Sequence, residues 1–253
     1  MRIKIAYARK KGTSHLYQQL PCQDYVKGSL KNNTACIALA DGAGSVPDSE
    51  IAAQAVVEVL VYEFTKHFND WYLMEDDVFK NMFVDVCNKK VCETSPVLLP
   101  TCTALIFAAA KDGRNFCCHI GDGVIFGIDC NGKVETISEP ENGEEPNQTF
   151  FVSGPDPQLH LRVKKNNTNV YKTIIMCSDG VAGSLWNKFT GEYAPALTRI
   201  SDWLSRYSEE QVSGRLEEEL DKTFREHSQD DMSMAVMHFT HEIICIERTE
   251  NEK

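Results

Sequence analysis

The sequence lacks an apolar stretch long enough to span a bilayer, and it has no excess of basic residues. Residues 1–11 are basic and alternate apolar with polar positions, which does not fit a secretory signal peptide. Acidic residues outnumber basic ones by 37 to 26, for a formal net charge of −11. Nucleic acid and anionic membranes would repel such a chain, so neither is expected as its main partner. We expect a cytoplasmic protein.

Pairs of the Cys-x-x-Cys type are absent, although the chain has ten cysteines. Cys36, Cys102, Cys117 and Cys177 each lie inside an apolar run. This usage is typical of reduced, buried thiols and disfavours a disulfide framework or a zinc site. No His or oxyanion motif surrounds any of them to favour a catalytic cysteine.

Regular alternation of strands and helices is absent too, which disfavours a doubly wound parallel sheet. Many strand-like segments follow one another through hairpin signals. Helices are expected from Pro47, over residues 75–93, and late in the chain over residues 196–207 and 209–226. The pattern predicts an α+β fold of antiparallel sheets with helices outside. No linker or internal repeat divides the 253 residues, so one domain is expected over residues 1–253.

Some segments give weaker signals. Residues 10–25 are predicted to be a polar loop, and residues 183–195 an irregular segment. Short apolar runs predict strands at residues 150–152 and 159–163. Residues 232–239 predict a long final strand, with residues 241–246 as a possible extension.

Aspartates recur where apolar runs begin or end. Residues 35–40 are apolar and lead to Asp41, after which the chain turns at Gly42. Asp122 follows the run at residues 116–120, Asp179 follows residues 172–177, and the pair Asp230-Asp231 precedes residues 232–239. Each such site alone is most simply a turn, because Asp-Gly is a common turn dipeptide. Together they suit hard divalent cations, which prefer several carboxylate oxygens.

The full ordered set of motifs resembles the type-2C, metal-dependent protein serine/threonine phosphatases, and their bacterial-type branch in particular. The motifs are Gln23-Asp24, Asp41-Gly42-Ala43-Gly44-Ser45, Thr101-Cys102-Thr103-Ala104, Gly121-Asp122-Gly123, Ser178-Asp179-Gly180-Val181 and Asp230-Asp231-Met232-Ser233. The resemblance extends from about Gly12 to Phe239. It implies a four-layer αββα sandwich of two antiparallel β-sheets flanked by helix pairs, with the metal site at one end.

The resemblance also implies site residues and a reaction. Asp41 would bridge two Mn(II) or Mg(II) ions, the Gly42 carbonyl would bind one of them, and Asp179 and Asp230 would bind the other. These acids would act in catalysis through metal-bound water, since paired divalent ions make hydroxide available near neutral pH and offset phosphoryl charge. The implied reaction is hydrolysis of phosphoserine and phosphothreonine in proteins. A protein kinase that produces such substrates is an implied partner.

Further positions follow from the same comparison. Asp24 would hold metal-bound water, and Asp122 matches a position that binds a third, weaker ion in some relatives. Asp231 would be a neighbour with no direct role. The chain departs from the family where Ala43 replaces a His that is a candidate general acid, and where Gly183 replaces an Asp of the third-ion site. A third ion is therefore doubtful.

The phosphate-binding residue is not identified by the sequence. Relatives carry an Arg shortly before the early Asp, and this chain offers only Arg9, Lys10 or Lys11 nearby. His15 lies in the early loop, where a structural role is favoured over a catalytic one. Thr103 and Ser178 are expected to support strand ends by hydrogen bonding.

Ala43 and the missing Arg motivate an alternative function, namely a catalytically weak or inactive phosphatase fold that acts as a sensor or scaffold. The intact acids argue against it. A phosphatase with an aspartate nucleophile is disfavoured, because that chemistry usually needs an acid or Thr where Ala43 stands.

Overall fold

The computed structural model describes residues 2–95, 100–143 and 149–240. The strands are β1 (Arg2–Lys10), β2 (Asp24–Lys31), β3 (Thr34–Asp41), β4 (Ala104–Ala110), β5 (Asn115–Ile120), β6 (Val124–Asp129), β7 (Val134–Ser138), β8 (Arg162–Asn166), β9 (Tyr171–Cys177), β10 (Trp186–Asn187), β11 (Glu192–Tyr193) and β12 (Met232–Thr240). The helices are α1 (Thr13–Gln18), α2 (Ser49–Leu73), α3 (Asp76–Thr94), α4 (Pro157–His160), α5 (Asp179–Leu185), α6 (Ala196–Arg206), α7 (Glu209–Lys222) and the short 3₁₀ helix η1 (Phe224–Glu226).

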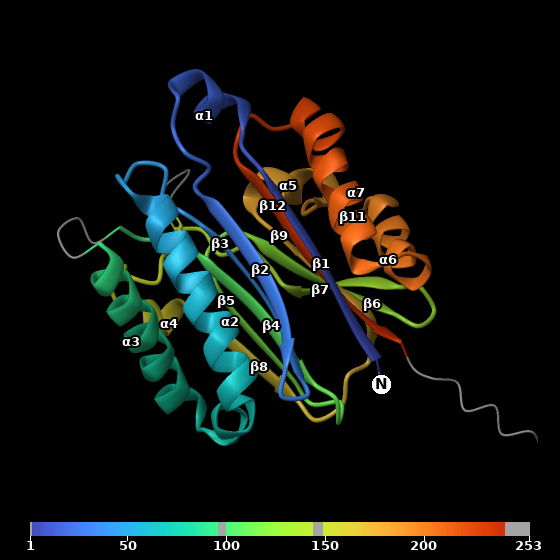
Figure 1. Cartoon of the computed structure of the whole chain (residues 1–253), viewed down its shortest axis with the longest axis horizontal. Helices are drawn as coiled ribbons and strands as arrows, with labels where there is room; N and C mark the ends of the chain where they lie inside the picture. Colours follow the sequence, from blue (N-terminus) through green and yellow to red (C-terminus); the bar gives the residue numbers. More distant parts are fainter. Residues whose placement is uncertain (1, 96–99, 144–148, 241–253) are drawn as a thin grey trace, which may run out of the picture.

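Two five-stranded sheets form the centre of the molecule. Their strand orders are β1-β12-β9-β6-β7 and β2-β3-β4-β5-β8, and every pairing in them is antiparallel. Figure 1 shows α2 and α3 along the outer side of the second sheet and α6 and α7 along that of the first. The αββα sandwich expected from the resemblance is confirmed.

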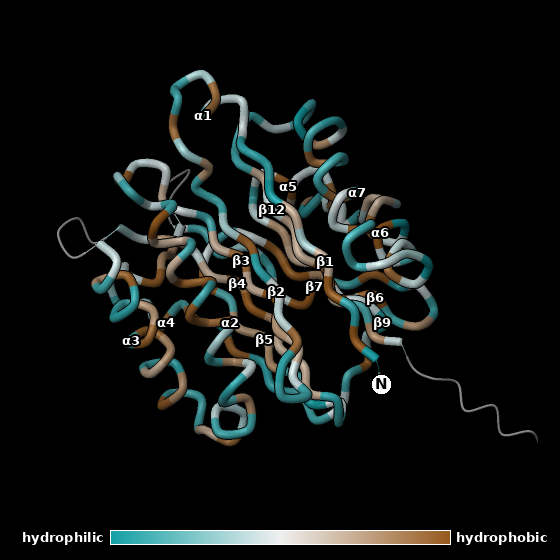
Figure 2. Tube along the Cα trace, in the orientation of Figure 1, coloured by the Kyte–Doolittle hydropathy of each residue, from teal (hydrophilic) through white to brown (hydrophobic). Residues whose placement is uncertain are grey.

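Strand β3 illustrates how the sequence produces these layers. Side chains alternate between the two faces of a strand. Ala35, Ile37 and Leu39 pack into the core between the sheets, whereas Cys36 and Ala38 pack into the core beneath α2 and α3. Both faces are therefore buried, which explains why this strand is continuously apolar (Figure 2).

The helices lie close to their expected positions. Helix α2 begins at Ser49, just after Pro47, and its backbone departs from helical geometry at His67, where φ is −117°. Helix α3 begins and ends within one residue of the predicted range. Helices α6 and α7 also form where expected, and a capping box of Ser208 and Gln211 fixes the start of α7.

Four local predictions need correction. The expected polar loop at residues 10–25 contains α1 and the start of β2, and the irregular segment at 183–195 contains the β10–β11 hairpin. Residues 150–152 are not a strand: the Val152 N–H bonds the Cys102 carbonyl, and the Phe150 ring stacks on His160. The strand predicted at 159–163 starts only at Arg162, because helix α4 occupies the residues before it. The extension at 241–246 lies outside the described residues.

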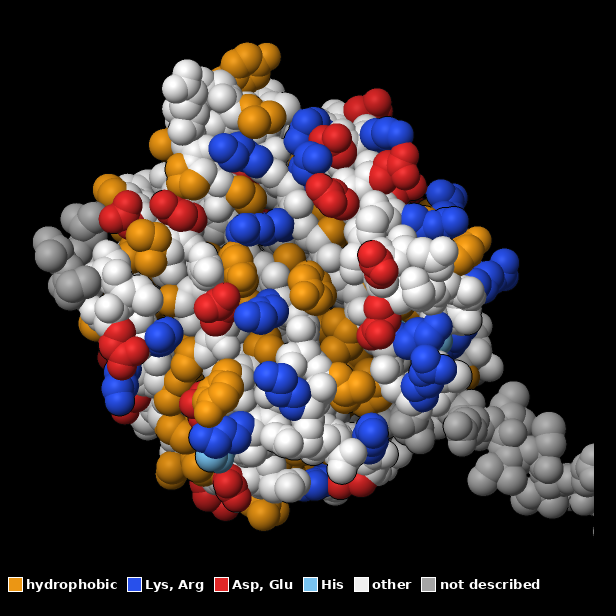
Figure 3. Space-filling model, viewed as in Figure 1, with side chains coloured by type: hydrophobic (Ala, Val, Ile, Leu, Met, Phe, Trp, Pro, Cys, Tyr) orange, Lys and Arg blue, Asp and Glu red, His pale blue; other side chains and the backbone are white. Residues whose placement is uncertain are grey.

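The surface in the view of Figure 3 shows lysine and arginine interspersed with aspartate and glutamate. Within the described ranges, no helix combines the length and apolarity that crossing a membrane requires.

Candidate metal-binding active site

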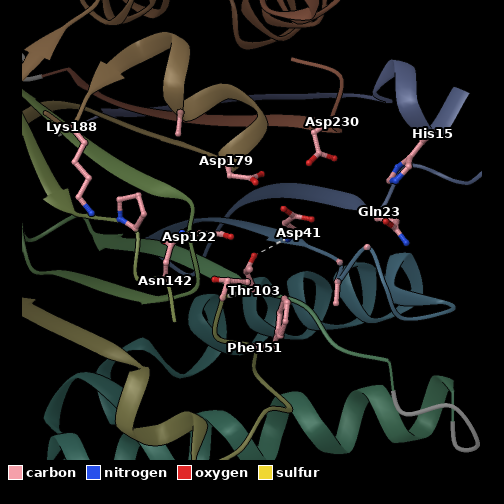
Figure 4. A pocket seen from close by; sticks show the side chains of 16 residues that line it. His15, Gln23, Asp41, Thr103, Asp122, Asn142, Phe151, Asp179, Lys188 and Asp230 are labelled. Atoms are coloured by element: carbon pink, nitrogen blue, oxygen red, sulfur yellow. Dashed lines mark hydrogen bonds between the residues drawn. The ribbon is translucent and has the colours of Figure 1, made fainter. Parts of the chain in front are cut away.

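A cavity of about 570 Å³ opens at one end of the sandwich. Four carboxylates line it: Asp41 at the end of β3, Asp122 in the β5–β6 turn, Asp179 at the start of α5 and Asp230 before β12. Figure 4 shows these side chains pointing toward one another from four separate segments. Gly42 also lines the cavity, so the structure brings together all the residues predicted to be direct metal ligands.

Backbone hydrogen bonds fix Asp41 and Gly42. The Asp41 N–H donates to the Thr103 hydroxyl (2.9 Å), and the Thr103 N–H donates to the Asp41 carbonyl (2.8 Å). The Gly42 N–H donates to the Gln23 carbonyl (3.1 Å). A Cβ atom at Gly42 would lie 2.7 Å from the backbone of Ser49, so the start of α2 can come this close only to glycine. Thr103 thus supports the strand end as predicted.

Asp24 lies beside Asp41 on the neighbouring strand, behind the cavity wall. It is 1% exposed, and its Cα is directly opposite that of Asp41. The Ser233 hydroxyl donates to one of its oxygens (2.6 Å), and its Oδ1 is buried with no hydrogen-bond partner among the described residues. Ser178 supports the same corner, since its hydroxyl accepts from the Ser233 N–H (3.0 Å).

Asp231, expected to have no direct role, is a structural anchor. Its carboxylate is 1% exposed and accepts from the backbone N–H groups of Gly12 (2.7 Å) and Gln23 (2.5 Å). It also accepts from the His15 ring nitrogen Nδ1 (2.9 Å). Asp231 therefore ties the loop before β12 to both ends of the segment that carries α1, and it places His15 at the cavity wall.

Burial, and after it the charges of neighbouring acids, disfavours the charged form of the carboxylates of the site. Burial raises the pKa of Asp24 to about 8, with the charges of Asp231 and Asp179 adding to the effect. The pKa of Asp41 is raised well above its usual value by burial, then by Asp24 and Asp179. Asp179 is exposed to solvent at the cavity. Protein atoms packed around its carboxyl group still remove part of its hydration, and together with the charges of Asp122 and Asp230 they raise its pKa to about 6.

These observations fit divalent cations. Carboxylates that are held together against their own repulsion, including a buried Asp24 oxygen and a buried Asp122 oxygen without hydrogen-bond partners in the described residues, need nearby positive charge. Oxygen-only donors of this kind suit Mg(II) or Mn(II). Among the described residues, no three His, Cys, Asp or Glu side chains lie close enough together to coordinate one metal ion as they stand.

The basic residues suggested for phosphate binding serve elsewhere. The Arg9 guanidinium donates to the Asp24 carbonyl (2.7 Å) and lies over the Tyr25 ring. Lys10 pairs with Glu217 and Asp221 on α7, and the Lys11 ammonium donates to the Leu20 carbonyl.

Lys188 is instead the only lysine or arginine among the described residues that line the cavity. It follows β10, within the segment that the sequence predicted to be irregular. No motif or periodicity marked it, because only the folding of the β10–β11 hairpin brings it to the cavity.

Two glycines of α5 make a matched test of packing at the site. A Cβ at Gly180 would lie 2.1 Å from the Asp231 backbone oxygen, whereas a Cβ at Gly183 would meet nothing within 4 Å. We expect Gly180→Ala to lower the free energy of unfolding by at least about 2 kcal/mol, as overpacking against fixed backbone does. Gly183→Ala should raise it by roughly 0.5–1 kcal/mol, because alanine is the better helix former. Urea denaturation of both variants measures this, and equal effects would contradict the packing described.

Comparison with known proteins agrees with this geometry. The sequence profile named Protein phosphatase 2C matches residues 11–224, a range that includes Asp24, Asp41, Asp122 and Asp179. The chain belongs to the protein phosphatase 2C family.

Individual relatives cover almost the whole chain. Serine/threonine-protein phosphatase 3 of Escherichia coli (strain K12) is 26% identical, over 93% of this chain and 98% of the relative. The crystal structure of the Mycobacterium tuberculosis serine/threonine phosphatase PstP/Ppp superposes with a TM-score of 0.67, at 17% identity over 95% of this chain and 100% of that one. RsbX, crystallised in complex with magnesium, superposes with a TM-score of 0.57, at 14% identity over 94% and 96% of the two chains.

Proposed function

We propose that this protein hydrolyses phosphoserine and phosphothreonine in other proteins, with two Mn(II) or Mg(II) ions held in the acidic cavity. Asp41, Asp179, Asp230 and the Gly42 carbonyl would hold the ions, and Asp24 would orient water bound to them. When bound, the ions supply positive charge for the phosphoryl group and lower the pKa of water to near neutrality. The observation that carries the proposal is the convergence of four carboxylates from four segments on one open cavity.

The remaining cavity residues support water as the nucleophile. Neither serine nor cysteine lines the described wall, and the Thr103 hydroxyl accepts a hydrogen bond from the Asp41 N–H. Ala43 lines the wall where some relatives carry histidine, so the chain offers no general acid at that position. Gly183 brings no carboxylate toward Asp122, so two ions are proposed and not three.

The proposed substrates imply a partner class. A protein that carries phosphoserine or phosphothreonine must have received the phosphate from a protein kinase. We therefore infer that a kinase acting on the same substrates works opposite this protein.

Removing the metal tests the proposal. We expect metal-stripped protein to release no phosphate from a phosphothreonine peptide, and Mn(II) or Mg(II) to restore turnover by at least about a hundredfold, since bound ions provide several kcal/mol of transition-state stabilisation. Phosphate release after chelation and metal addition measures this. Metal binding without hydrolysis would support the alternative function as a sensor or scaffold. Phosphate release that continues unchanged after chelation would refute the metal mechanism.

A further inference from the structure

The hairpin that follows α5 carries a fully exposed aromatic side chain, Phe189, directly after Lys188, which lines the cavity. Strands β10 and β11 pair through Trp186–Tyr193 and Asn187–Glu192, and Lys188 and Phe189 begin the connecting turn. Phe189 is 101% exposed. Contact of the whole phenyl ring with water is unfavourable, and burial against an apolar partner would relieve it.

The turn is built to hold this position. The Asn187 side-chain oxygen accepts from the backbone N–H groups of Phe189 (3.0 Å) and Thr190 (3.2 Å), and the Asn187 carbonyl accepts from the Gly191 N–H (2.8 Å). Gly191 has φ of +73°, a left-handed conformation that glycine adopts without strain. The apex is thus closed by three hydrogen bonds to one residue.

The base of the hairpin is anchored to the first sheet. The rings of Trp186 and Tyr193 stack on each other, and both meet Phe126 of β6 edge to face. The Tyr193 hydroxyl also shares a hydrogen bond with Thr136 of β7 (3.0 Å). These contacts fix the hairpin relative to the acids, because β6 follows directly from the turn that carries Asp122.

Lys188, on the same turn, lines the edge of the cavity. Figure 4 shows its side chain running down the wall on the side of Asn142, opposite His15, with its ammonium away from Asp41. The lysine is thus placed at the rim, where it would meet groups that flank a phosphate bound among the acids.

Surface hollows connect the acids with the base of the hairpin. One hollow shares Asp179 with the main cavity and continues past Gly180, Gly183 and Ser184. The next shares Gly183 and Ser184 and extends along both strands of the hairpin. The small residues Gly180, Gly183 and Ser184 therefore lie in hollows between the cavity and the hairpin, on the side where a bound peptide would pass the hairpin.

We propose that the hairpin turn is a docking element for the phosphoprotein substrate. Lys188 would pair with an acidic side chain near the phosphorylated residue, and Phe189 would contact an apolar side chain of the same segment. The inference rests on the proposed phosphatase activity and deepens it. It predicts that preferred substrates carry acidic and apolar residues around the phosphoserine or phosphothreonine.

A charge-reversal experiment tests the role of Lys188. Two phosphothreonine peptides are compared in Mn(II), one flanked by glutamates and one by lysines. We expect the wild type to prefer the acidic peptide about two- to fivefold in kcat/KM, the size of an exposed ion pair. Lys188→Glu should reverse this preference. Lys31→Glu, at the far end of β2 from Asp24, makes the same change in net charge and should leave the preference as in the wild type.

The possible outcomes separate the inference from the function it rests on. If Lys188→Glu and Lys31→Glu show the same preference, the docking role of Lys188 is refuted. If Lys188→Glu slows both peptides equally, the lysine binds the phosphate itself and the proposed contact is wrong. If the wild type hydrolyses neither peptide, the phosphatase proposal fails and the inference fails with it.

The role of Phe189 is tested by comparing kcat/KM for peptides with kcat/KM for a small substrate that is too short to reach the hairpin turn. A series of phosphothreonine peptides places one leucine at successive positions, and p-nitrophenyl phosphate serves as the small substrate. We expect one leucine position to raise the kcat/KM ratio of peptide to small substrate, and Phe189→Ser to lower that ratio roughly three- to tenfold. Leu73→Ser, which removes a 78% exposed side chain at the end of α2, should not change it. A ratio that is equal in both variants would refute the apolar contact.

Discussion

Asp179→Asn is expected to abolish phosphate release from a phosphothreonine peptide, even with saturating Mn(II). The carboxylate lies in the cavity with Asp41, Asp122 and Asp230, and its removal takes away a proposed ligand and one negative charge. Loss of several kcal/mol of metal-dependent stabilisation lowers the rate by two to three powers of ten or more. Initial rates over a range of Mn(II) concentrations measure the effect. A variant that retains a tenth of wild-type kcat would contradict the assignment.

Asp179→Asn should not lower the stability of the fold, so a loss of activity in this variant can be distinguished from unfolding. The raised pKa of Asp179 means that the folded state binds more protons than the unfolded state between about pH 4 and pH 6. This carboxyl therefore lowers the stability of the metal-free protein as pH rises through that window. In EDTA at pH 8, we expect Asp179→Asn to have a Tm equal to or slightly above that of the wild type. A large fall in Tm would mean that lost activity reflects unfolding.

Asp231→Ala is expected to lower the free energy of unfolding by roughly 3–5 kcal/mol, because several hydrogen-bond donors lose their acceptor at about 1–3 kcal/mol each when buried. The substitution leaves the N–H groups of Gly12 and Gln23 without their acceptor and frees the His15 ring. Unsatisfied buried donors are costly because they lose water without gaining another partner. Urea denaturation in EDTA measures the loss without a contribution from bound metal.

Asp221→Ala is the matched control for this prediction. Asp221 pairs with Lys10 and Arg225 at the half-exposed surface of α7, where ion pairs contribute about 0–1 kcal/mol. If both alanine variants lose the same small amount, Asp231 is not the anchor described.

Local signals in the sequence predict antiparallel sheets with helices outside and acids at the ends of apolar runs, whereas the four layers and the shared site follow from the family resemblance. The continuous apolar run of β3 reflects burial on both faces, and the aspartates follow directly from the ends of such runs. Asp41, Asp122, Asp179 and Asp230 line one cavity as the ordered motifs imply.

Helix α1 and the roles of Asp231 and Lys188 were not predicted, because they depend on tertiary contacts. Helix α1 buries none of its residues, so no apolar periodicity marks it, and its start is fixed by the bond from the Ser14 N–H to the Gln229 carbonyl. The sequence gives no sign of the role of Asp231, because its three hydrogen-bond donors come from the other end of the chain. Lys188 reaches the cavity only through the hairpin that aromatic contacts hold to β6.

The central claim is that the cavity acids form a site for divalent cations. Diffraction from crystals soaked in Mn(II), with anomalous maps at the manganese edge, tests it most directly. The account predicts two anomalous peaks among Asp41, Asp179 and Asp230, and their loss in Asp179→Asn crystals. No peak in the cavity, at a Mn(II) concentration that saturates activity, would contradict it.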